Sequence, residues 1–206
     1  MFITIEGGEG SGKTSALKLI VDDLAKNGFV ILQTREPGGT PIAEQIRSVI
    51  LDPENTALDA RAEALLYAAS RRQHLVEKVW PAEREGKVVI CDRFIDSSLV
   101  YQGIARGIGI KEVLDMNMFA TEGDLPELSI FFDIEPKVGF ERIAKNKNRE
   151  INRLDLEALS FHEKVREGFR MIAKMYPERC VIIDASQPLQ NVVQNVLKII
   201  YGRLKV

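Results

Sequence analysis

The segment 7–14, GGEGSGKT, carries phosphate-binding residue types at the spacing G-x-x-x-x-G-K-T. It follows an apolar run, Phe2–Glu6, and leads into a helical pattern that begins at Lys13. In this setting glycines let backbone N–H groups turn toward phosphate oxygens, and the helix start adds unpaired amides and the positive end of its dipole. We therefore predict that a nucleoside triphosphate binds to Gly7, Gly8, Glu9, Gly10, Ser11, Gly12, Lys13 and Thr14.

A magnesium ion is expected beside these phosphates. The Lys13 ammonium can reach the β- and γ-phosphates, and the Thr14 hydroxyl can ligate Mg²⁺. Asp92 ends the apolar run VVICD, and ligands of parallel α/β sheets lie beyond the carboxyl ends of the strands. An isolated aspartate at a strand end is usually a cap or turn residue. Beside a phosphate-binding loop, however, we interpret Asp92 as a second metal-binding residue, acting directly or through water.

The elements that must position these residues alternate between short apolar runs and longer amphipathic patterns. The expected strands are Phe2–Glu6, Phe29–Thr34, Lys87–Asp92, Leu128–Asp133 and Cys180–Asp184. The expected helices are Lys13–Asn27, Ala60–Val79 with a stop near Pro81, Lys111–Thr121, Pro136–Lys145, Asp155–Met175 and Leu189–Leu204. This alternation predicts a three-layer α/β fold with helices on both faces of a parallel sheet.

Composition limits the other possibilities. The 206 residues predict one domain, 1–206, and the net charge of −2 without a basic cluster argues against binding to a nucleic-acid backbone. No apolar run approaches the roughly 20 residues that span a membrane, and the N-terminus does not resemble a signal peptide. We therefore expect a cytoplasmic protein in which Cys91 and Cys180 are buried free thiols.

The remaining motifs resemble those of thymidylate kinases, and the resemblance covers essentially the whole chain. The segments that carry it are EGGEGSGKT, TREPGGT, RAEALLYAASRRQH, CDRFIDSSLVYQG, ARGIGI, NRLD and DASQPL. The resemblance implies a P-loop NTPase fold like that of nucleoside monophosphate kinases, with a five-stranded parallel sheet and a mobile lid. It also implies a homodimer that transfers the γ-phosphoryl group of ATP to dTMP with Mg²⁺, giving ADP and dTDP.

Two residues on one helix could hold the acceptor base. Tyr67 and Arg71 are four residues apart, so they share a helix face, where the ring could stack on a planar base and the guanidinium could donate to a carbonyl. The resemblance assigns these roles toward thymine, although the family commonly has Phe at position 67, so the tyrosine hydroxyl must find a partner. It also places Gln102 and Ser98 at the base and Tyr101 near the sugar. Without the motif, Ser98 and Gln102 would look like helix-surface positions.

The acceptor phosphate needs positive charge, and Arg35, Arg47 and Arg93 are the candidates because a guanidinium can hold a phosphate bidentately. For Arg47, a solvated helix charge is an equally good interpretation. Glu9 lies inside the phosphate-binding loop, where a carboxylate is costly unless something offsets its charge. The resemblance places an acidic residue here close to the acceptor sugar and phosphate.

The polar segment at about 142–153 is the expected lid. Some thymidylate kinases carry an arginine after the acidic loop residue, but Gly10 stands there in this chain. The resemblance then assigns the basic residues to the lid. Among these we expect Arg149 and Arg153 to contact the transferred phosphate, and Arg142, just before the lid, could stack on adenine. A charged run of this kind is otherwise a solvated loop.

The predicted chemistry needs no general base, because the acceptor phosphate oxygen is already ionised. Catalysis would rest on alignment and charge neutralisation, and His74 and His162 are expected at the surface. Other enzymes with this loop, such as kinases for adenylate, cytidylate or deoxynucleosides, remain alternatives. A GTPase switch would need an NKxD segment, which the sequence lacks, and a non-catalytic ATP-binding module would be expected to lack the acceptor-site arginines.

Overall fold

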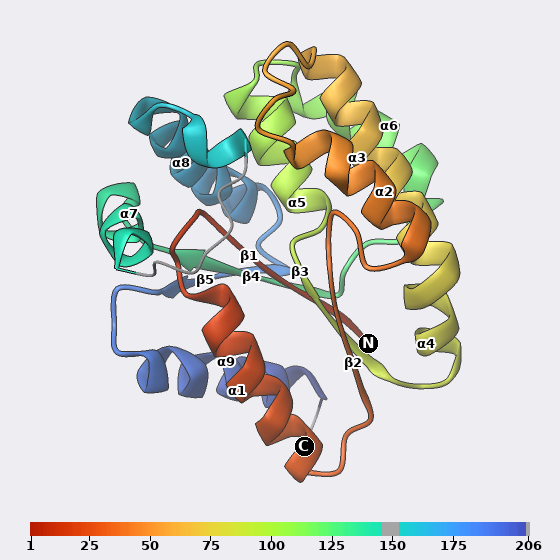
Figure 1. Ribbon diagram of the computed structural model, residues 1–206. Coiled ribbons are helices and arrows are strands. Elements are labelled where there is room, and N and C mark those ends of the chain that lie inside the picture. Colours follow the sequence, from red (N-terminus) through yellow and green to blue (C-terminus); the bar gives the residue numbers. More distant parts are fainter. Residues whose placement is uncertain (146–152, 205–206) are drawn as a thin grey trace.

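A computed structural model describes residues 1–145 and 153–204 of the chain. Its centre is a five-stranded, wholly parallel sheet in the order β2-β3-β1-β4-β5 (Figure 1). The strands are β1 (Phe2–Gly7), β2 (Ile31–Arg35), β3 (Val88–Asp92), β4 (Leu128–Asp133) and β5 (Cys180–Asp184). All five therefore lie within two residues of the predicted runs, which confirms the strand predictions.

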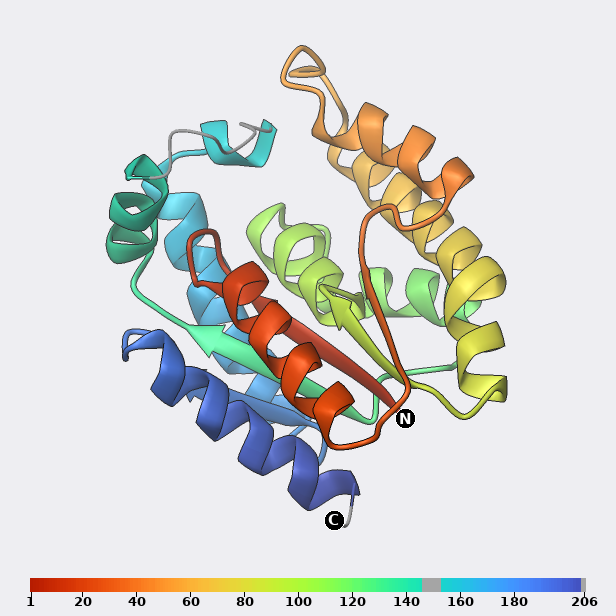
Figure 2. The same cartoon turned by 60° about the horizontal axis from the view of Figure 1, so that its bottom comes forward.

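Helices cover both faces of the sheet (Figure 2). The residues of β1 alternate, so that Ile3 and Ile5 pack with α1 and α9 while Phe2 packs with the helices of the opposite face. The α-helices are α1 (Lys13–Lys26), α2 (Pro41–Leu51), α3 (Ala60–His74), α4 (Trp80–Arg84), α5 (Ile95–Ser98), α6 (Ile110–Thr121), α7 (Pro136–Ala144), α8 (Leu159–Met175) and α9 (Leu189–Leu204). The predicted three-layer α/β fold is confirmed.

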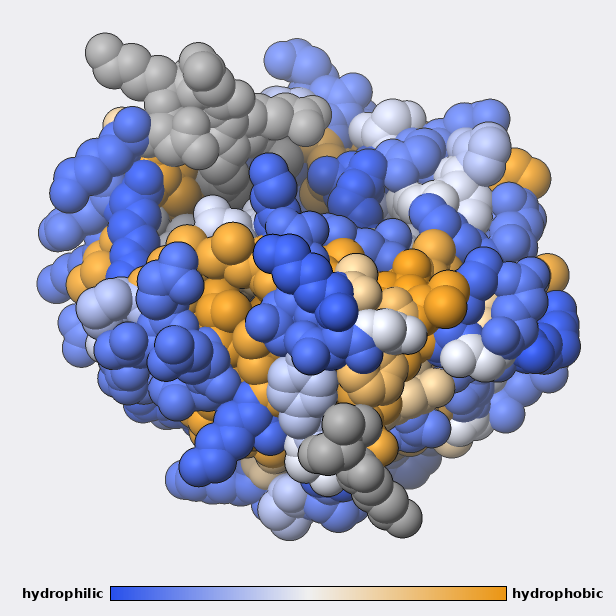
Figure 3. Space-filling model, turned by 90° about the horizontal axis from the view of Figure 1, so that it is seen from below, coloured by the Kyte–Doolittle hydropathy of each residue, from blue (hydrophilic) through white to orange (hydrophobic). Residues whose placement is uncertain are grey.

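The face of the molecule that carries α1 and α9 alternates in polarity over short distances (Figure 3). Seen from the side of α1 and α9, strips of apolar residues are interrupted by hydrophilic side chains (Figure 3). Within the described residues, no helix is both long enough and apolar enough to cross a membrane.

The helix prediction around Pro81 was wrong. The chain does not leave the helical path there, because a π-helical turn, Leu75–Val79, joins α3 to α4. Pro81 lies in the first turn of α4, where its missing N–H is tolerated. The predicted helix over 155–175 is also divided, into a 3₁₀ turn at Arg153–Leu156 and then α8.

Both histidines were expected at the surface, and both are buried. His74 is 0% exposed and lies between Glu36 Oε1, 2.9 Å from Nδ1, and Thr34 Oγ1, 2.7 Å from Nε2. His162 is 4% exposed and meets the ring of Phe140 edge-on at 4.8 Å. Helical periodicity alone did not reveal that the faces carrying them are covered by other elements.

The cysteine prediction holds for one residue only. Cys91 is fully buried, whereas Cys180 begins the edge strand β5 and is partly exposed. Burial raises the pKa of the Cys180 thiol to about 12, so this thiol is protonated at neutral pH.

Candidate active site

The loop between β1 and α1 forms a cradle of backbone amides. Gly10 and Gly12 have φ angles of +69° and +88°, values that L side chains rarely adopt, and α1 begins directly afterwards. The Lys13 ammonium folds back to donate to the carbonyl oxygens of Gly7 at 2.9 Å and Gly8 at 3.0 Å. Burial, with the nearby Arg93 charge, lowers the pKa of Lys13 to about 8. A bound polyphosphate would favour the charged ammonium instead.

The cradle packs against α7, the helix that leads into residues 146–152. A Cβ atom added to Gly10 would overlap the backbone of Gly139 in α7, and one added to Gly139 would overlap the carbonyl oxygen of Glu9. Position 10 therefore has no room for an arginine. The two glycines let the phosphate-binding loop and α7 approach each other backbone to backbone.

Asp92, at the end of β3, lies on the same cavity as Lys13 and Thr14. Its Oδ1 atom is buried and has no hydrogen-bond partner, which is costly unless a ligand satisfies it. The Thr14 hydroxyl is on an exposed residue at the first turn of α1. An orphaned carboxylate oxygen and a threonine hydroxyl that line the same cavity fit Mg²⁺, which takes few protein ligands and keeps its other sites for phosphate and water.

The positive charge of Arg93 offsets the negative charge of Glu9 inside the loop. Its Nη2 lies 2.5 Å from Glu9 Oε1, and Nη1 donates to the Tyr101 hydroxyl at 3.2 Å. The guanidinium carbon also lies 5.2 Å from the centre of the Tyr101 ring, which is within cation–π range. Although burial acts to lower its pKa, the surrounding Tyr101 and acidic residues raise the pKa of Arg93 above its ordinary value. Arg93 has φ +69°, an uncommon conformation for a non-glycine residue that aims it into the crevice.

Arg71 is held at three points in the interior. Nε forms an ion pair with Glu36 Oε2 at 2.9 Å, and Nη1 donates to Ser98 Oγ at 3.1 Å and to the side-chain oxygen of Asn117. The residue is 1% exposed, and the Phe94 ring lies 4.9 Å from the guanidinium carbon. Within the described residues no acceptor meets Nη2, so this nitrogen is the one left for a ligand in the cavity.

Tyr67 lies one turn before Arg71 on α3 and is half-buried. The expectation that its hydroxyl finds a partner is not met by any residue that the structure describes. Burial, followed by the charge of Glu63, raises the pKa of Tyr67 to about 12, so the hydroxyl stays protonated and can donate to water or a ligand. Tyr67 and Arg71 both line the cavity.

Gln102 and Ser98 lie in buried helical turns, not on an exposed helix face. Ser98 ends α5 and is 2% exposed, and Gln102 is 1% exposed in the π-helical segment Leu99–Ala105 that follows. Gln102 Nε2 donates to Glu63 Oε1 at 2.8 Å. Both residues line the cavity, so their surroundings differ from the surface positions that their types alone suggest.

Arg35 and Arg47 converge on the loop after β2. Arg35 Nη1 donates to the Pro37 carbonyl oxygen at 2.8 Å, and Arg47 Nη1 donates to the same oxygen at 3.1 Å. Glu44 pairs with Arg35 at 2.8 Å. Hydrogen bonds from Gly39 N–H and Arg35 hold the pKa of Glu44 below its usual value despite partial burial. The loop thereby holds two guanidinium groups at the cavity wall.

One cavity of about 530 Å³ joins these groups. Nearly all described residues that the sequence predicted for the site line it: Glu9, Gly10, Ser11, Gly12, Lys13, Thr14, Arg35, Arg47, Tyr67, Arg71, Asp92, Arg93, Ser98, Tyr101, Gln102 and Arg142. Gly7, Gly8 and Arg153 do not line it, and Arg149 lies outside the described residues. Residues predicted to bind the base and residues predicted to bind phosphate therefore line the same cavity.

Arg142 and Arg153, at the two ends of the expected lid, have protein partners. Arg142 lines the cavity, and its Nη1 donates to the carbonyl oxygen of Ala185, directly after β5, at 3.0 Å. Arg153 is 7% exposed, and its Nε donates to the Ile50 carbonyl oxygen at 3.0 Å while Nη2 pairs with Glu63. The structure thus places Arg153 against α2 and α3.

Sequence reasoning missed Glu63 and Asn117. Glu63 is 1% exposed and contacts Gln102, Arg106 and Arg153, and Asn117 is 0% exposed and fixes Arg71. Glu63 lies four residues before Tyr67, on the helix face that also carries Arg71, and this spacing was the available signal. No local pattern distinguishes Asn117 from a surface residue of an amphipathic helix.

The fold and the site together define a P-loop nucleoside monophosphate kinase: the carboxyl edge of a parallel sheet presents the loop of residues 7–14, and one cavity extends from this loop to Tyr67 and Arg71 of α3. Comparison with known proteins gives the family. A family model described as thymidylate kinase matches residues 5–196, so the chain belongs to the thymidylate kinase family.

Two relatives and one solved structure illustrate the likeness. The chain is 58% identical over 205 residues to the thymidylate kinase of Halalkalibacterium halodurans, covering 100% of this chain and 98% of the relative. It is 60% identical over 195 residues to that of Clostridium novyi, with 95% of each covered. A crystal structure of thymidylate kinase from Ehrlichia chaffeensis superimposes with a TM-score of 0.78 at 32% identity, over 97% of both chains.

These findings confirm the predicted function. The chain is an enzyme, a nucleoside monophosphate kinase that transfers a phosphoryl group from ATP to dTMP. They favour this assignment over the adenylate- and cytidylate-kinase alternatives and over a GTPase switch or a non-catalytic ATP-binding module.

Proposed function

We propose that this one domain, residues 1–206, performs the transfer as follows. The cradle of residues 7–14 holds the ATP phosphates, with Lys13 at the β- and γ-phosphates. The single observation that supports this best is the shared cavity, because the cradle and the base pocket open into the same 530 Å³ space. Such an enclosure aligns donor and acceptor phosphates and excludes water.

Thr14 and Asp92 would hold Mg²⁺ between the phosphates, and the ion would supply charge neutralisation for the transferred group. The partnerless Oδ1 of Asp92 supports this role. No group of three or more His, Cys, Asp or Glu side chains in the described part of the chain is arranged to hold a metal. That is the expected condition for an ion whose remaining ligands are phosphate and water.

The acceptor, dTMP, would lie with its base against Tyr67 and its carbonyl at the free Nη2 of Arg71. Gln102 and Ser98 would contact the base edge, and Tyr101 would lie beside the sugar. The acceptor phosphate would meet Arg93, with Arg35 and Arg47 completing the positive wall. The convergence of the latter two on Pro37 supports this arrangement.

Glu9 would act at the acceptor sugar and phosphate through its pair with Arg93. Arg93 is thus both a binding group and the charge that makes a carboxylate tolerable inside the cradle. Arg142 would stack on adenine, which its position beside Ala185 at the cavity wall supports.

The lid would belong to the subtype with its basic residues in the segment 142–153. What supports this is the absence of room for any side chain at Gly10. Arg149 and Arg153 would then stabilise charge on the transferred phosphoryl group. For Arg153 this requires exchanging its present partner Glu63 for phosphate when the lid closes.

The enzyme would work as a cytoplasmic homodimer. The exposed apolar residues Leu65 of α3, at 59%, and Met118 and Phe119 of α6, at 36% and 89%, support a subunit contact on these two helices. Helices α3 and α6 pack together and also carry Arg71 and Asn117, so a contact there would stiffen the base pocket.

The test is ADP release with Mg-ATP against a panel of nucleoside monophosphates. We expect dTMP to support turnover, AMP and GMP not to, and chelation of Mg²⁺ to abolish activity. Lys13→Ala should lose turnover while its circular-dichroism spectrum and melting temperature stay near those of the parent. Turnover by Lys13→Ala at the parent rate would contradict the role of the cradle.

A further inference from the structure

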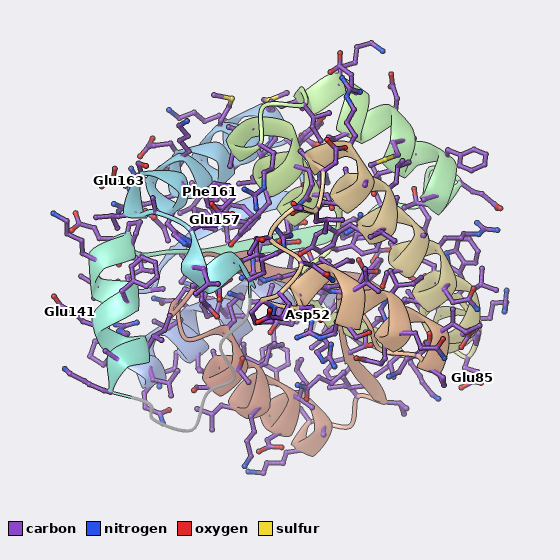
Figure 4. The ribbon with its side chains drawn as sticks, turned by 45° about the horizontal axis from the view of Figure 1, so that its top comes forward. Asp52, Glu85, Glu141, Glu157, Phe161 and Glu163 are labelled. Atoms are coloured by element: carbon purple, nitrogen blue, oxygen red, sulfur yellow. The ribbon has the colours of Figure 1, made fainter. Side chains whose placement is uncertain are left out.

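The carboxylate of Glu63 is buried at a junction behind the base pocket. Glu63 is 1% exposed, and its Oε1 accepts from Gln102 Nε2 at 2.8 Å. Two guanidinium groups face the same carboxylate: Arg106, whose Nε is 3.5 Å from Oε1, and Arg153, which pairs with Oε2. Arg106 is itself held by Glu157 at 2.6 Å and lies over the Phe161 ring at 4.7 Å. Glu157 and Phe161 lie next to each other around the start of α8 (Figure 4).

This contact decides which way the Gln102 amide points. A carboxylate flanked by two guanidinium groups is an acceptor only, so the amide atom that meets it must be the NH₂ group. The side-chain amide oxygen of Gln102, Oε1, is therefore the atom that can face the cavity. In the part of the chain that the structure describes, no protein donor meets this oxygen, although Gln102 is 1% exposed and lines the cavity wall.

We propose that Glu63 is a specificity-determining, positioning residue. By accepting from Gln102 Nε2, it fixes the amide so that a hydrogen-bond acceptor faces the acceptor base. This inference rests on the proposed role of Gln102 at the base. Its consequence is selection for pyrimidines that present a ring N–H, as thymine and uracil do at N3, and against cytosine, whose N3 is an acceptor.

The selection against cytosine arises because the Gln102 amide oxygen and cytosine N3 are both hydrogen-bond acceptors. Two acceptors brought together in a desolvated pocket repel each other, and neither is hydrogen-bonded. Cytosine would therefore lose the Gln102 contact and suffer a repulsion in addition. If the amide could turn over, its NH₂ group would donate to cytosine N3 and this part of the discrimination would disappear.

The variant Glu63→Gln tests this directly, because a glutamine at position 63 can donate as well as accept and so permits either orientation of Gln102. We measure kcat/KM with dTMP, dUMP and dCMP in the complete enzyme with Mg-ATP. The dTMP-to-dCMP ratio should fall by about tenfold or more, since a buried hydrogen-bond mismatch carries discrimination of at least that size. The dTMP-to-dUMP ratio should stay within about twofold of the parent, because both bases present the same ring N–H.

Loss of the negative charge also affects Arg153 and Arg106, but that effect is common to the three acceptors and cancels in the ratios. The matched control is Arg106→Met, which removes a neighbour of the same carboxylate and leaves the Glu63–Gln102 bond in place. Its dTMP-to-dCMP ratio should equal that of the parent. An unchanged ratio in Glu63→Gln, or equal falls of both ratios, would overturn the proposal.

Gln102→Leu separates this inference from the proposed function. If Gln102→Leu leaves the KM for dTMP unchanged, the assigned role of Gln102 is wrong. If it raises that KM while Glu63→Gln keeps its dTMP-to-dCMP ratio, only the positioning role of Glu63 is wrong. Should Glu63→Gln fail to fold, proton NMR of the parent decides: the Gln102 amide protons should show cross-relaxation with the Glu63 γ-protons with and without dTMP, and its absence would refute the inference.

Discussion

The contact between the phosphate cradle and α7 gives a sharp prediction for the substitution Gly139→Ala. The substitution has two opposite effects on the free energy of unfolding: a gain in helix propensity and a steric overlap with the cradle. Gly139→Ala would normally stabilise a helix interior by about 1 kcal/mol. Here the new Cβ would lie closer than 3.0 Å to the carbonyl oxygen of Glu9, and ordinary contact begins at 3.4 Å. The loop and α7 must therefore separate by at least 0.4 Å, from 3.4 − 3.0.

The steric overlap in Gly139→Ala should lower both the stability of the protein and its catalytic rate. Overpacking of this kind costs about 1–3 kcal/mol, so the helix gain is cancelled and the free energy of unfolding should fall by roughly 0–2 kcal/mol. A displacement of 1 Å can lower a rate about 100-fold, so 0.4 Å or more at the cradle should lower kcat/KM for ATP by about sixfold or more. The shift also moves Arg142 and Ile143, which line the cavity.

The assay is steady-state ADP release with ATP varied at saturating dTMP, alongside urea unfolding. Gly202→Ala is the matched control, because it also lies in a helix, α9, but nothing is within 4 Å of its added Cβ. It should gain up to about 1 kcal/mol and keep parental kinetics. Parental kcat/KM for ATP in Gly139→Ala, together with increased stability, would refute the close approach of the cradle and α7.

Three further predictions follow from the buried charges and the exposed apolar face. Arg71→Ala should raise the KM for dTMP far more than that for ATP, by roughly 100-fold if about 3 kcal/mol of charge-assisted bonding is lost; equal effects on both substrates would remove Arg71 from the base pocket. Burial, with the charge of Asp96, raises the pKa of Glu6 from 4.5 to about 7. Because the folded state then holds the proton more tightly than the unfolded state, stability is lost as pH rises from 4.5 through 7, by about 3 kcal/mol at most. Glu6→Gln should abolish this loss in urea titrations at pH 4.5 and 7.5, and an unchanged slope would show that another group causes it. Phe119→Asp, on α6, should convert the proposed dimer to a monomer in light scattering. Leu189→Asp, which changes an exposed apolar residue of α9, should leave the proposed dimer intact. Dimers in both variants would place the subunit contact elsewhere.

Local signals in the sequence were enough for the frame and for the phosphate end of the site. The five strands are short apolar runs, and Gly7, Gly10 and Gly12 of segment 7–14 stand at positions of positive φ. The acceptor-base end was predicted through the family motifs. Its residues Gln102 and Ser98, taken alone, looked like surface positions.

What the sequence could not reveal is how buried polar side chains pair across the fold. Glu63 and Arg153 are 90 residues apart, and Arg71 and Asn117 are 46 apart, so no window of local pattern joins them. His74 shows the same limit, because its burial depends on Glu36 and Thr34 from the loop after β2 and from β2 itself. The π-helical turn that carries the chain past Pro81 has no signature in helix periodicity.

The most direct test of the account is a crystal structure with Mg²⁺, dTMP and a non-hydrolysable ATP analogue bound together. We expect the analogue's phosphates within residues 7–14, the ion between Thr14 and Asp92, and thymine against Tyr67 with its carbonyl at Arg71. A triphosphate bound outside the cradle, or thymine bound away from α3, would contradict the account.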